Sequence, residues 1–212
     1  MYMYLYLTQQ YIYTKLGNAV ILFDGSARTI VDLRTTLQCV QGNNPRSISF
    51  MIQTTTTADA RILYTGSPVS LKTFGMCINC GGAASGLLVI DIGNAYYKPS
   101  TGKAVNDGLW HTLLVTYNGS ALSIYVDGRL DNIVTNWNAG STATIASTLN
   151  TIGNMANYLG QDAIGLSGRW PGKLKNVVFY DYVITNSYAL GNSYQSVQSM
   201  IYSSGNNYLI FI

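Results

Sequence analysis

Residues 107–129 constrain the fold of this chain more than any other stretch, because they have the pattern of two β-strands joined by a tight turn. Two apolar runs rich in β-branched and aromatic residues flank the pair Asn118-Gly119. Such a pair between two runs is a strong hairpin signal, since a type I′ turn requires positive φ at both central residues. A second turn signal, Asp127-Gly128, closes the unit. The stretch therefore predicts an antiparallel hairpin with Asn118-Gly119 as its two-residue turn.

Other segments with strand character follow one another along the chain. Residues 46–53 alternate polar and apolar side chains, a period of two that places Ile48, Phe50 and Ile52 on a buried face. Residues 87–90 are apolar throughout, which predicts a strand buried on both faces. Further strands are expected at 19–25, 60–65, 74–80, 149–153, 158–160 and 169–181, with 131–151 read as a loop plus a short strand. The pattern predicts an all-β chain.

Four of these segments carry, in order, the features of one family. Residues 19–25 end in Phe-Asp-Gly, 46–53 resemble the family strand "sisfwvk", 107–129 contain Asp-Gly-x-Trp-His and Val-Asp-Gly, and 169–181 resemble its closing strand. Over residues 19–190 the chain resembles the laminin G-like branch of the concanavalin A-like lectin/glucanase superfamily. The resemblance implies a two-sheet antiparallel jelly-roll sandwich that binds more often than it catalyses. One departure is Lys173 and Lys175, which stand where the family usually has an acidic pair.

We expect a single sandwich domain at 17–212, preceded by an N-terminal strand or arm at 1–16. Tyrosines alternate with apolar residues over 1–13, which predicts a strand with tyrosine on one face, and 208–212 is a second uncharged strand. These terminal strands either join the domain's own sheets or pair with neighbouring subunits. The resemblance also implies a short helix that begins near Thr185.

Charge is scarce in this chain. Only 10% of the residues are charged, against about 25% in ordinary soluble domains. The 12 Lys and Arg residues are scattered and the net charge is only +3, so we expect no nucleic-acid partner. No apolar run approaches the ~18 residues of a membrane-spanning helix. The first residues lack a cationic region, so we expect no signal peptide, and the localisation stays open; a virion or a surface assembly is compatible.

The acidic residues argue against a glycosidase. All 9 are Asp, whereas the glucanases of the resembling superfamily use Glu at period two on one strand. No Asp-x-Asp occurs, and the pair Asp127 and Asp131 straddles a predicted turn. A Ser-His-Asp triad would need His111, the only histidine, which in the family belongs to a structural strand. We therefore expect a protein that is not an enzyme.

The three cysteines include a Cys-x-x-Cys pair, Cys77 and Cys80. A structural zinc site needs four ligands, and only Cys39 and His111 are available to complete one, without finger-like spacing. A redox motif would begin a helix, whereas this pair lies in or after a strand. We expect two buried or turn-located thiols, either free or bonded to each other.

The resemblance also implies that one Ca²⁺ can be held at the sandwich rim by an Asp and backbone carbonyls, since this ion prefers oxygen ligands. Asp59 and Asp162, both in predicted loops, are the candidate ligands; the alternative is that they cap turns. No other cofactor is expected.

Sugar binding requires an aromatic face with amides or carboxylates beside it. Two groups in predicted loops meet this requirement, namely Tyr96 and Tyr97 beside Asn94, and Trp137 between Asn136 and Asn138. These residues are the candidate ligand-binding set.

Two functions fit the sequence. The first is a lectin or adhesin, a non-catalytic recognition module that binds a glycan or a glycoprotein through loops at the rim of the sandwich. The second is a structural subunit of a capsid, spike or fibre with no small ligand, which the low charge, the tyrosine-rich terminal strand and the odd cysteine favour. The two are compatible.

Overall fold

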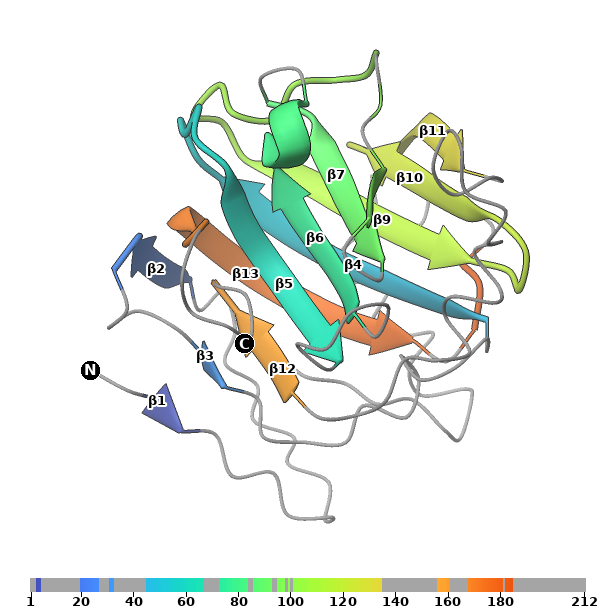
Figure 1. Ribbon diagram of the computed structural model, residues 1–212, viewed down its shortest axis with the longest axis horizontal. Coiled ribbons are helices and arrows are strands. Elements are labelled where there is room, and N and C mark those ends of the chain that lie inside the picture. Colours follow the sequence, from blue (N-terminus) through green and yellow to red (C-terminus); the bar gives the residue numbers. More distant parts are fainter. Residues whose placement is uncertain are drawn as a thin grey trace.

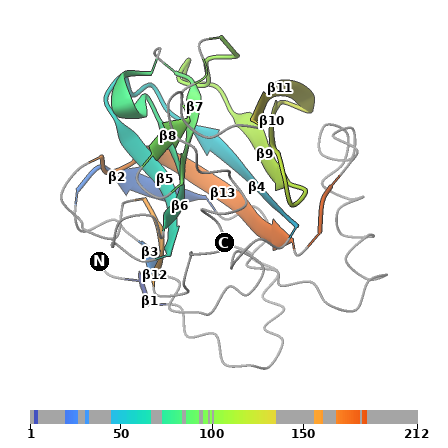
Figure 2. The same cartoon turned by 45° about the vertical axis from the view of Figure 1, so that its right-hand side comes forward.

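The chain forms two β-sheets that pack face to face (Figures 1 and 2). This computed structural model describes residues 3–4, 20–26, 31–32, 45–66, 73–83, 86–92, 95–97, 99, 101–134, 156–160, 168–180 and 182–184. Every neighbouring strand pair within them is antiparallel apart from β1 with β3. The expected all-β sandwich is confirmed.

Sheet A consists, in spatial order, of β1 (Met3–Tyr4), β3 (Val31–Asp32), β12 (Ala156–Leu159), β5 (Ala60–Gly66), β6 (Thr73–Ile78), β7 (Leu88–Ile92) and β8 (Ala95–Tyr97). Sheet B consists of β11 (Arg129–Val134), β10 (Leu122–Val126), β9 (His111–Tyr117), β4 (Arg46–Gln53), β13 (Pro171–Tyr180) and β2 (Ile21–Asp24). A short 3-10 helix, η2 (Cys80–Gly82), follows β6.

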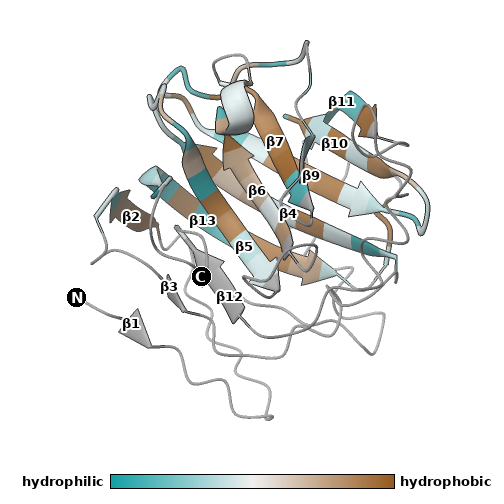
Figure 3. Cartoon of the chain, viewed as in Figure 1, coloured by the Kyte–Doolittle hydropathy of each residue, from teal (hydrophilic) through white to brown (hydrophobic). Residues whose placement is uncertain are grey.

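The core lies between the two sheets and is made by alternate residues of their strands. Ile48, Phe50 and Ile52 of β4 are buried in it, as their spacing predicted. Phe74 and Met76 of β6 contribute from sheet A. Each such side chain contributes about 1.5–3 kcal/mol by leaving water. Figure 3 shows hydrophobic residues concentrated along β5, β6, β7 and β13.

The predicted hairpin is present as β9 and β10, but its turn differs from the prediction. Leu122 pairs with Tyr117, so the loop comprises 118–121. Positive φ among the described non-glycine residues does not occur at Asn118. Its side-chain Oδ1 instead accepts hydrogen bonds from the backbone N–H groups of Ser120 at 3.0 Å and Ala121 at 2.9 Å. An asparagine side chain can stabilise a turn in this way without a left-handed backbone.

The conformation that a type I′ turn demands occurs at the next turn instead. Asp127 has φ 50° and Gly128 has φ 76°, and they connect β10 to β11, where Val126 pairs with Arg129. The start of the stretch predicted as a loop at 131–151 therefore belongs to an edge strand.

The remaining strand predictions fall partly on described residues. Leu88, Val89 and Ile90 are at most 3% exposed, so the run is buried on both faces. The predictions for 158–160 and 169–181 correspond to β12 and β13. Residues 149–153, 208–212 and the helix at Thr185 lie outside the described residues. Of the N-terminal segment, Met3–Tyr4 pairs with β3 of the same chain.

One end of the sandwich collects several loops, which we call the rim. It comprises 54–59 between β4 and β5, 79–83 and 86–87 between β6 and β7, 101–110 before β9, and the turn 127–128. The rim lies at the top of Figure 1, around η2. Within the described part of the chain, no helix has the length and apolar character needed to cross a membrane.

Candidate functional site

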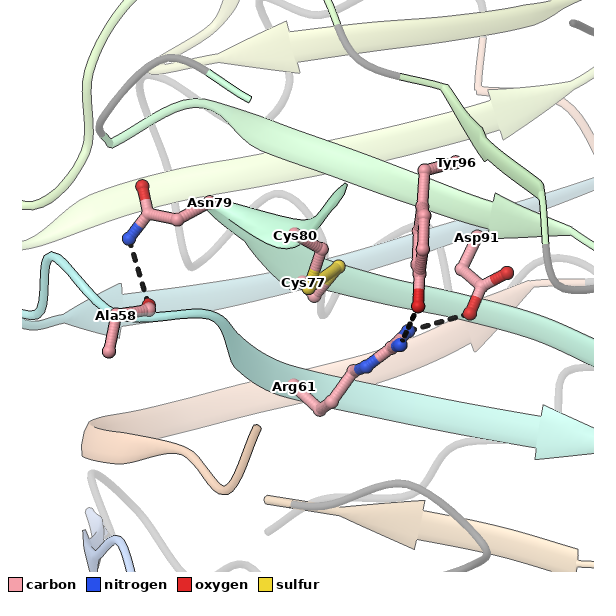
Figure 4. Close-up of a disulfide and its surroundings, with 7 residues drawn as sticks. All are labelled: Ala58, Arg61, Cys77, Asn79, Cys80, Asp91 and Tyr96. Atoms are coloured by element: carbon pink, nitrogen blue, oxygen red, sulfur yellow. Dashed lines mark hydrogen bonds and ion pairs between the residues drawn. A yellow bond between two sulfur atoms is a disulfide. The ribbon is translucent and has the colours of Figure 1, made fainter. Parts of the chain in front are cut away.

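Asn79 connects three segments of the rim through its side-chain amide. Its Nδ2 donates hydrogen bonds to the carbonyl oxygens of Ala58 at 2.9 Å and Thr56 at 3.3 Å (Figure 4). Its Oδ1 accepts one from the N–H of Gly86 at 2.6 Å. Asn79 has φ 64°, a left-handed conformation that asparagine tolerates better than most residues. The loops after β4 and β6 are therefore fixed to each other.

The segment 101–110 is held against the same loops. Asn106 Nδ2 donates to the carbonyl of Thr56 at 3.0 Å, and the N–H of Gly108 donates to the carbonyl of Thr54 at 2.9 Å. A Cβ at Gly86 would lie 2.2 Å from Asn106 Oδ1, so only glycine fits at this position. The rim is thus a hydrogen-bonded surface whose shape is set before any ligand arrives.

The side chains that this surface presents to solvent are mostly small, polar or acidic. The exposed rim residues include Thr55, Thr57, Asp59, Asp107 and Leu109. Leu109 is 63% exposed, which is unusual for an aliphatic side chain. Hydroxyls, carboxylates and one apolar group can contact the hydroxyls and C–H faces of a sugar or the side chains of a protein.

A buried histidine joins two aspartates at the rim. His111 is 3% exposed, and its Nε2 lies 2.9 Å from Asp107 Oδ1 while its Nδ1 lies 2.9 Å from Asp127 Oδ2. Ionised carboxylates only accept hydrogen bonds, so both ring nitrogens must donate and this geometry describes an imidazolium. Lys103 Nζ also contacts Asp127 Oδ2, at 2.5 Å. The cluster fixes the loop before β9 to the β10–β11 turn.

Both aspartates titrate below their ordinary range. Burial acts to raise the pKa of Asp127, but hydrogen bonds from Lys103, His111 and the N–H of Thr112 outweigh it, and the pKa is lowered. The hydrogen bond from His111, supported by the N–H of Leu109, lowers the pKa of Asp107. These contacts favour the charged carboxylates of the folded state.

We expect the protein to lose stability in acid through these two groups. A carboxylate with a lowered folded pKa contributes stability that is present above its unfolded value, about 3.9, and is lost as pH falls through the folded value. Urea denaturation followed by circular dichroism between pH 5 and 2 should therefore show a smaller decline for Asp127→Asn than for the wild type. Parallel profiles for the two proteins would contradict this assignment.

The structure places Tyr96 and Tyr97 in β8 rather than in a loop, on opposite faces of the strand. Tyr97 packs against the main core, and its hydroxyl lies 3.4 Å from Asn132 Oδ1. Tyr96 lies on the outer face of sheet A, where its hydroxyl accepts a hydrogen bond from Arg61 (Figure 4). The two rings therefore do not form one continuous platform.

Arg61 and Asp91 form a buried ion pair beside Tyr96. Arg61 Nη1 lies 2.6 Å from Asp91 Oδ2, and the two residues are 8% and 2% exposed. Burial acts to lower the pKa of Arg61, but Asp91 more than compensates and the pKa is raised. The ion pair holds β5 to β7 across β6 on this face.

The cysteine pair has a structural place on the same face. Cys77 and Cys80 form a disulfide with a Cα–Cα distance of 6.1 Å, and both are buried against Val89. Of the two alternatives for this pair, the bonded one is realised. It links the end of β6 to η2 and flanks Asn79, whereas Cys39 lies outside the described residues.

The other predicted site residues have different outcomes. Asp59 is exposed on the rim. Trp137, Asn136, Asn138 and Asp162 lie outside the described residues, so their roles stay predictions. The described ranges contain no cluster of three or more His, Cys, Asp or Glu side chains placed to hold a metal.

Sequence reasoning missed Asn79, Asn106 and the His111 cluster. The available signals were weak: an asparagine before Cys-Gly-Gly, and aspartates in two Asp-Gly pairs, which equally indicate turns.

The two sheets and the loop-bearing rim define a lectin-like β-sandwich. The sequence matches the concanavalin A-like lectin/glucanases superfamily over residues 26–188, more than half of the chain, and the chain belongs to this family. Laminin G-like domains of this kind are mostly binding modules without catalytic activity. A search of curated proteins gave no match.

Solved structures share the fold at low sequence identity. Domain 4 of the arabinanase AbnA from Geobacillus stearothermophilus, in complex with arabinotriose, has 16% identity and a TM-score of 0.54, with 81% of this chain and 74% of that chain covered. The heptameric pentraxin of Limulus polyphemus has 14% identity and a TM-score of 0.52, with 72% and 73% covered. Domains LG4–5 of the mouse laminin α1 chain have 20% identity and a TM-score of 0.50, with 78% and 42% covered.

Proposed function

We propose that this chain is a non-catalytic recognition module that binds a glycan or a glycoprotein through the rim. The observation that carries the proposal is the network around Asn79 and Asn106, which fixes the loops and leaves Thr55, Asp59 and Leu109 facing solvent. A surface ordered in advance loses little conformational entropy on binding. The family match and the sugar-bound arabinanase domain support a carbohydrate as the ligand.

Two observations support binding without catalysis. The chain contains no Glu, so the paired glutamates of a retaining glucanase have no counterpart. Both nitrogens of His111 face carboxylates at 2.9 Å, so the only histidine has no ring nitrogen available as a general base for a substrate.

Ca²⁺ is a further part of this proposal. Asp59 offers an exposed carboxylate at the rim, and Asp162 is the second proposed ligand. The carbonyls of Thr56 and Ala58 already accept hydrogen bonds from Asn79. Since Ca²⁺ takes about 6–8 oxygen ligands, Asp59 supplies one donor, and further oxygens would have to come from other loop residues.

A glycan array probed with and without Ca²⁺ tests the proposal. We expect the wild type to bind a defined subset of glycans and Asn79→Ala to bind them about tenfold more weakly, because the loops lose their shared anchor. Asn118→Ala is the matched control, since Asn118 also holds a loop, on the opposite end of the sandwich. Asp59→Asn and Trp137→Ala test the proposed metal ligand and the proposed aromatic contact.

No binding to any glycan in either condition, or equal losses for Asn79→Ala and Asn118→Ala, would contradict a rim site. Recovery of shortened glycans after incubation would contradict a module without catalytic activity.

A further inference from the structure

The outer face of sheet B gathers most of the exposed aliphatic side chains of the described residues. Large apolar side chains are exposed there at Val20 (44%), Leu22 (65%), Leu109 (63%), Leu130 (52%) and Ile133 (55%). Val20 and Leu22 lie next to or within the edge strand β2, and Leu130 and Ile133 lie in the opposite edge strand β11. Exposed apolar groups on one sheet indicate a surface that contacts something else.

The strand register places these residues on one face. Leu22 pairs with Lys173, and Lys173 pairs with Gln53. Leu130 pairs with Tyr125, and Ile133 pairs with Ser123. Paired residues of an antiparallel sheet share a face, and their sequence neighbours point to the other one. The neighbours Phe23, Ile52, Leu174 and Ile124 are all in the core, so the exposed set is on the outer face.

The centre of this face is cationic. Lys173 is exposed, and its Nζ donates a hydrogen bond to Gln53 Oε1 at 2.9 Å. Lys175 Nζ lies 4.3 Å from the ring centroid of Trp110, a cation–π contact. Among the described strand residues that the register assigns to this face, the only acidic one is Asp24, which ends β2. These are the lysines that replace the acidic pair usual in the family.

This combination of charge and shape selects one kind of occupant. A second copy laid face to face across the centre would bring lysines against lysines, which is repulsive. A glycan offers few apolar groups to Leu22, Leu130 and Ile133. We propose that the outer face of sheet B docks an acidic segment of a partner protein, whose carboxylates meet Lys173 and Lys175 and whose apolar side chains meet β2 and β11. This surface is separate from the rim.

The dimensions of the face fit a short segment. Strands in a sheet lie about 4.8 Å apart, so the distance from β2 to β11 is roughly 24 Å. An extended chain rises about 3.3 Å per residue, so about seven residues cross the face. Carboxylates near the β2 side and apolar residues toward both ends are the expected pattern.

Selection from a phage-displayed library of random dodecapeptides, with the full chain as bait, tests this proposal. We expect the enriched peptides to combine Asp or Glu with aliphatic or aromatic residues. Their synthetic versions should bind about tenfold more weakly to Lys173→Gln/Lys175→Gln, and more weakly as salt increases. Arg129→Gln, which removes an exposed cation from the β10–β11 turn, is the matched control and should bind as the wild type does.

Each other outcome overturns the proposal. Enriched peptides without carboxylates, or equal binding by the double lysine variant, would exclude charge-directed docking. A dimer that the double variant abolishes would assign the face to a second copy, and loss of array glycans in that variant would assign it to a sugar. Circular dichroism confirms that each variant is folded. Asn79→Ala should retain peptide binding, so a failed rim site and a failed docking face give different results.

Discussion

Asp91→Ala is expected to lower the free energy of unfolding by about 3–5 kcal/mol, because it leaves the Arg61 guanidinium buried without its carboxylate. Arg61 and Asp91 are 8% and 2% exposed, so water cannot readily replace the lost partner. The hydroxyl of Tyr96 remains beside Arg61, but it is neutral and cannot compensate a charge. Urea denaturation of the two proteins at pH 7 measures the difference.

The double variant Arg61→Met/Asp91→Leu is the control for this experiment. Replacing both members of a buried ion pair by apolar residues is often neutral or stabilising, so most of the stability lost in the single variant should return. A loss below about 1 kcal/mol for Asp91→Ala would mean that the pair is solvated and not part of the packed outer face of sheet A.

Phe23→Ala should destabilise the protein by about 3–5 kcal/mol, whereas Leu22→Ala should change its stability by less than about 0.5 kcal/mol. The two residues are adjacent in β2, but Phe23 is 2% exposed and packs in the core while Leu22 is 65% exposed on the other face. Thermal or urea denaturation distinguishes the variants. Similar losses for both would contradict the assignment of inner and outer faces on which the sandwich and the docking face depend.

The parts of the fold that could be predicted are those with a local signal. The alternation in β4 gave the correct buried face because a strand exposes every second residue to the same side. The hairpin β9–β10 was also predictable, since apolar runs around turn residues have few other solutions. Its turn type was not, because the side chain of Asn118 stabilises the loop by hydrogen bonds that do not require positive φ.

The rim could not be predicted because its contacts join residues far apart in the sequence. Asn79 bonds to Ala58, and His111 bonds to both Asp107 and Asp127. These partners come together only after the sheets have stacked, and nothing in the local composition distinguishes them from ordinary turn residues. The strand β8 has a similar cause: a polar segment around Tyr96 and Tyr97 pairs with the edge of β7 and satisfies its backbone groups.

Chemical-shift mapping by ¹⁵N NMR, during titration of the wild-type chain with a glycan selected on the array, tests most directly that this sandwich binds through its rim without catalysis. We expect perturbed amides in 54–59, 79–87 and 101–110 and ligand signals that persist unchanged through the titration. Perturbations centred on the loop 118–121 at the other end, or new signals from a cleaved ligand, would contradict it.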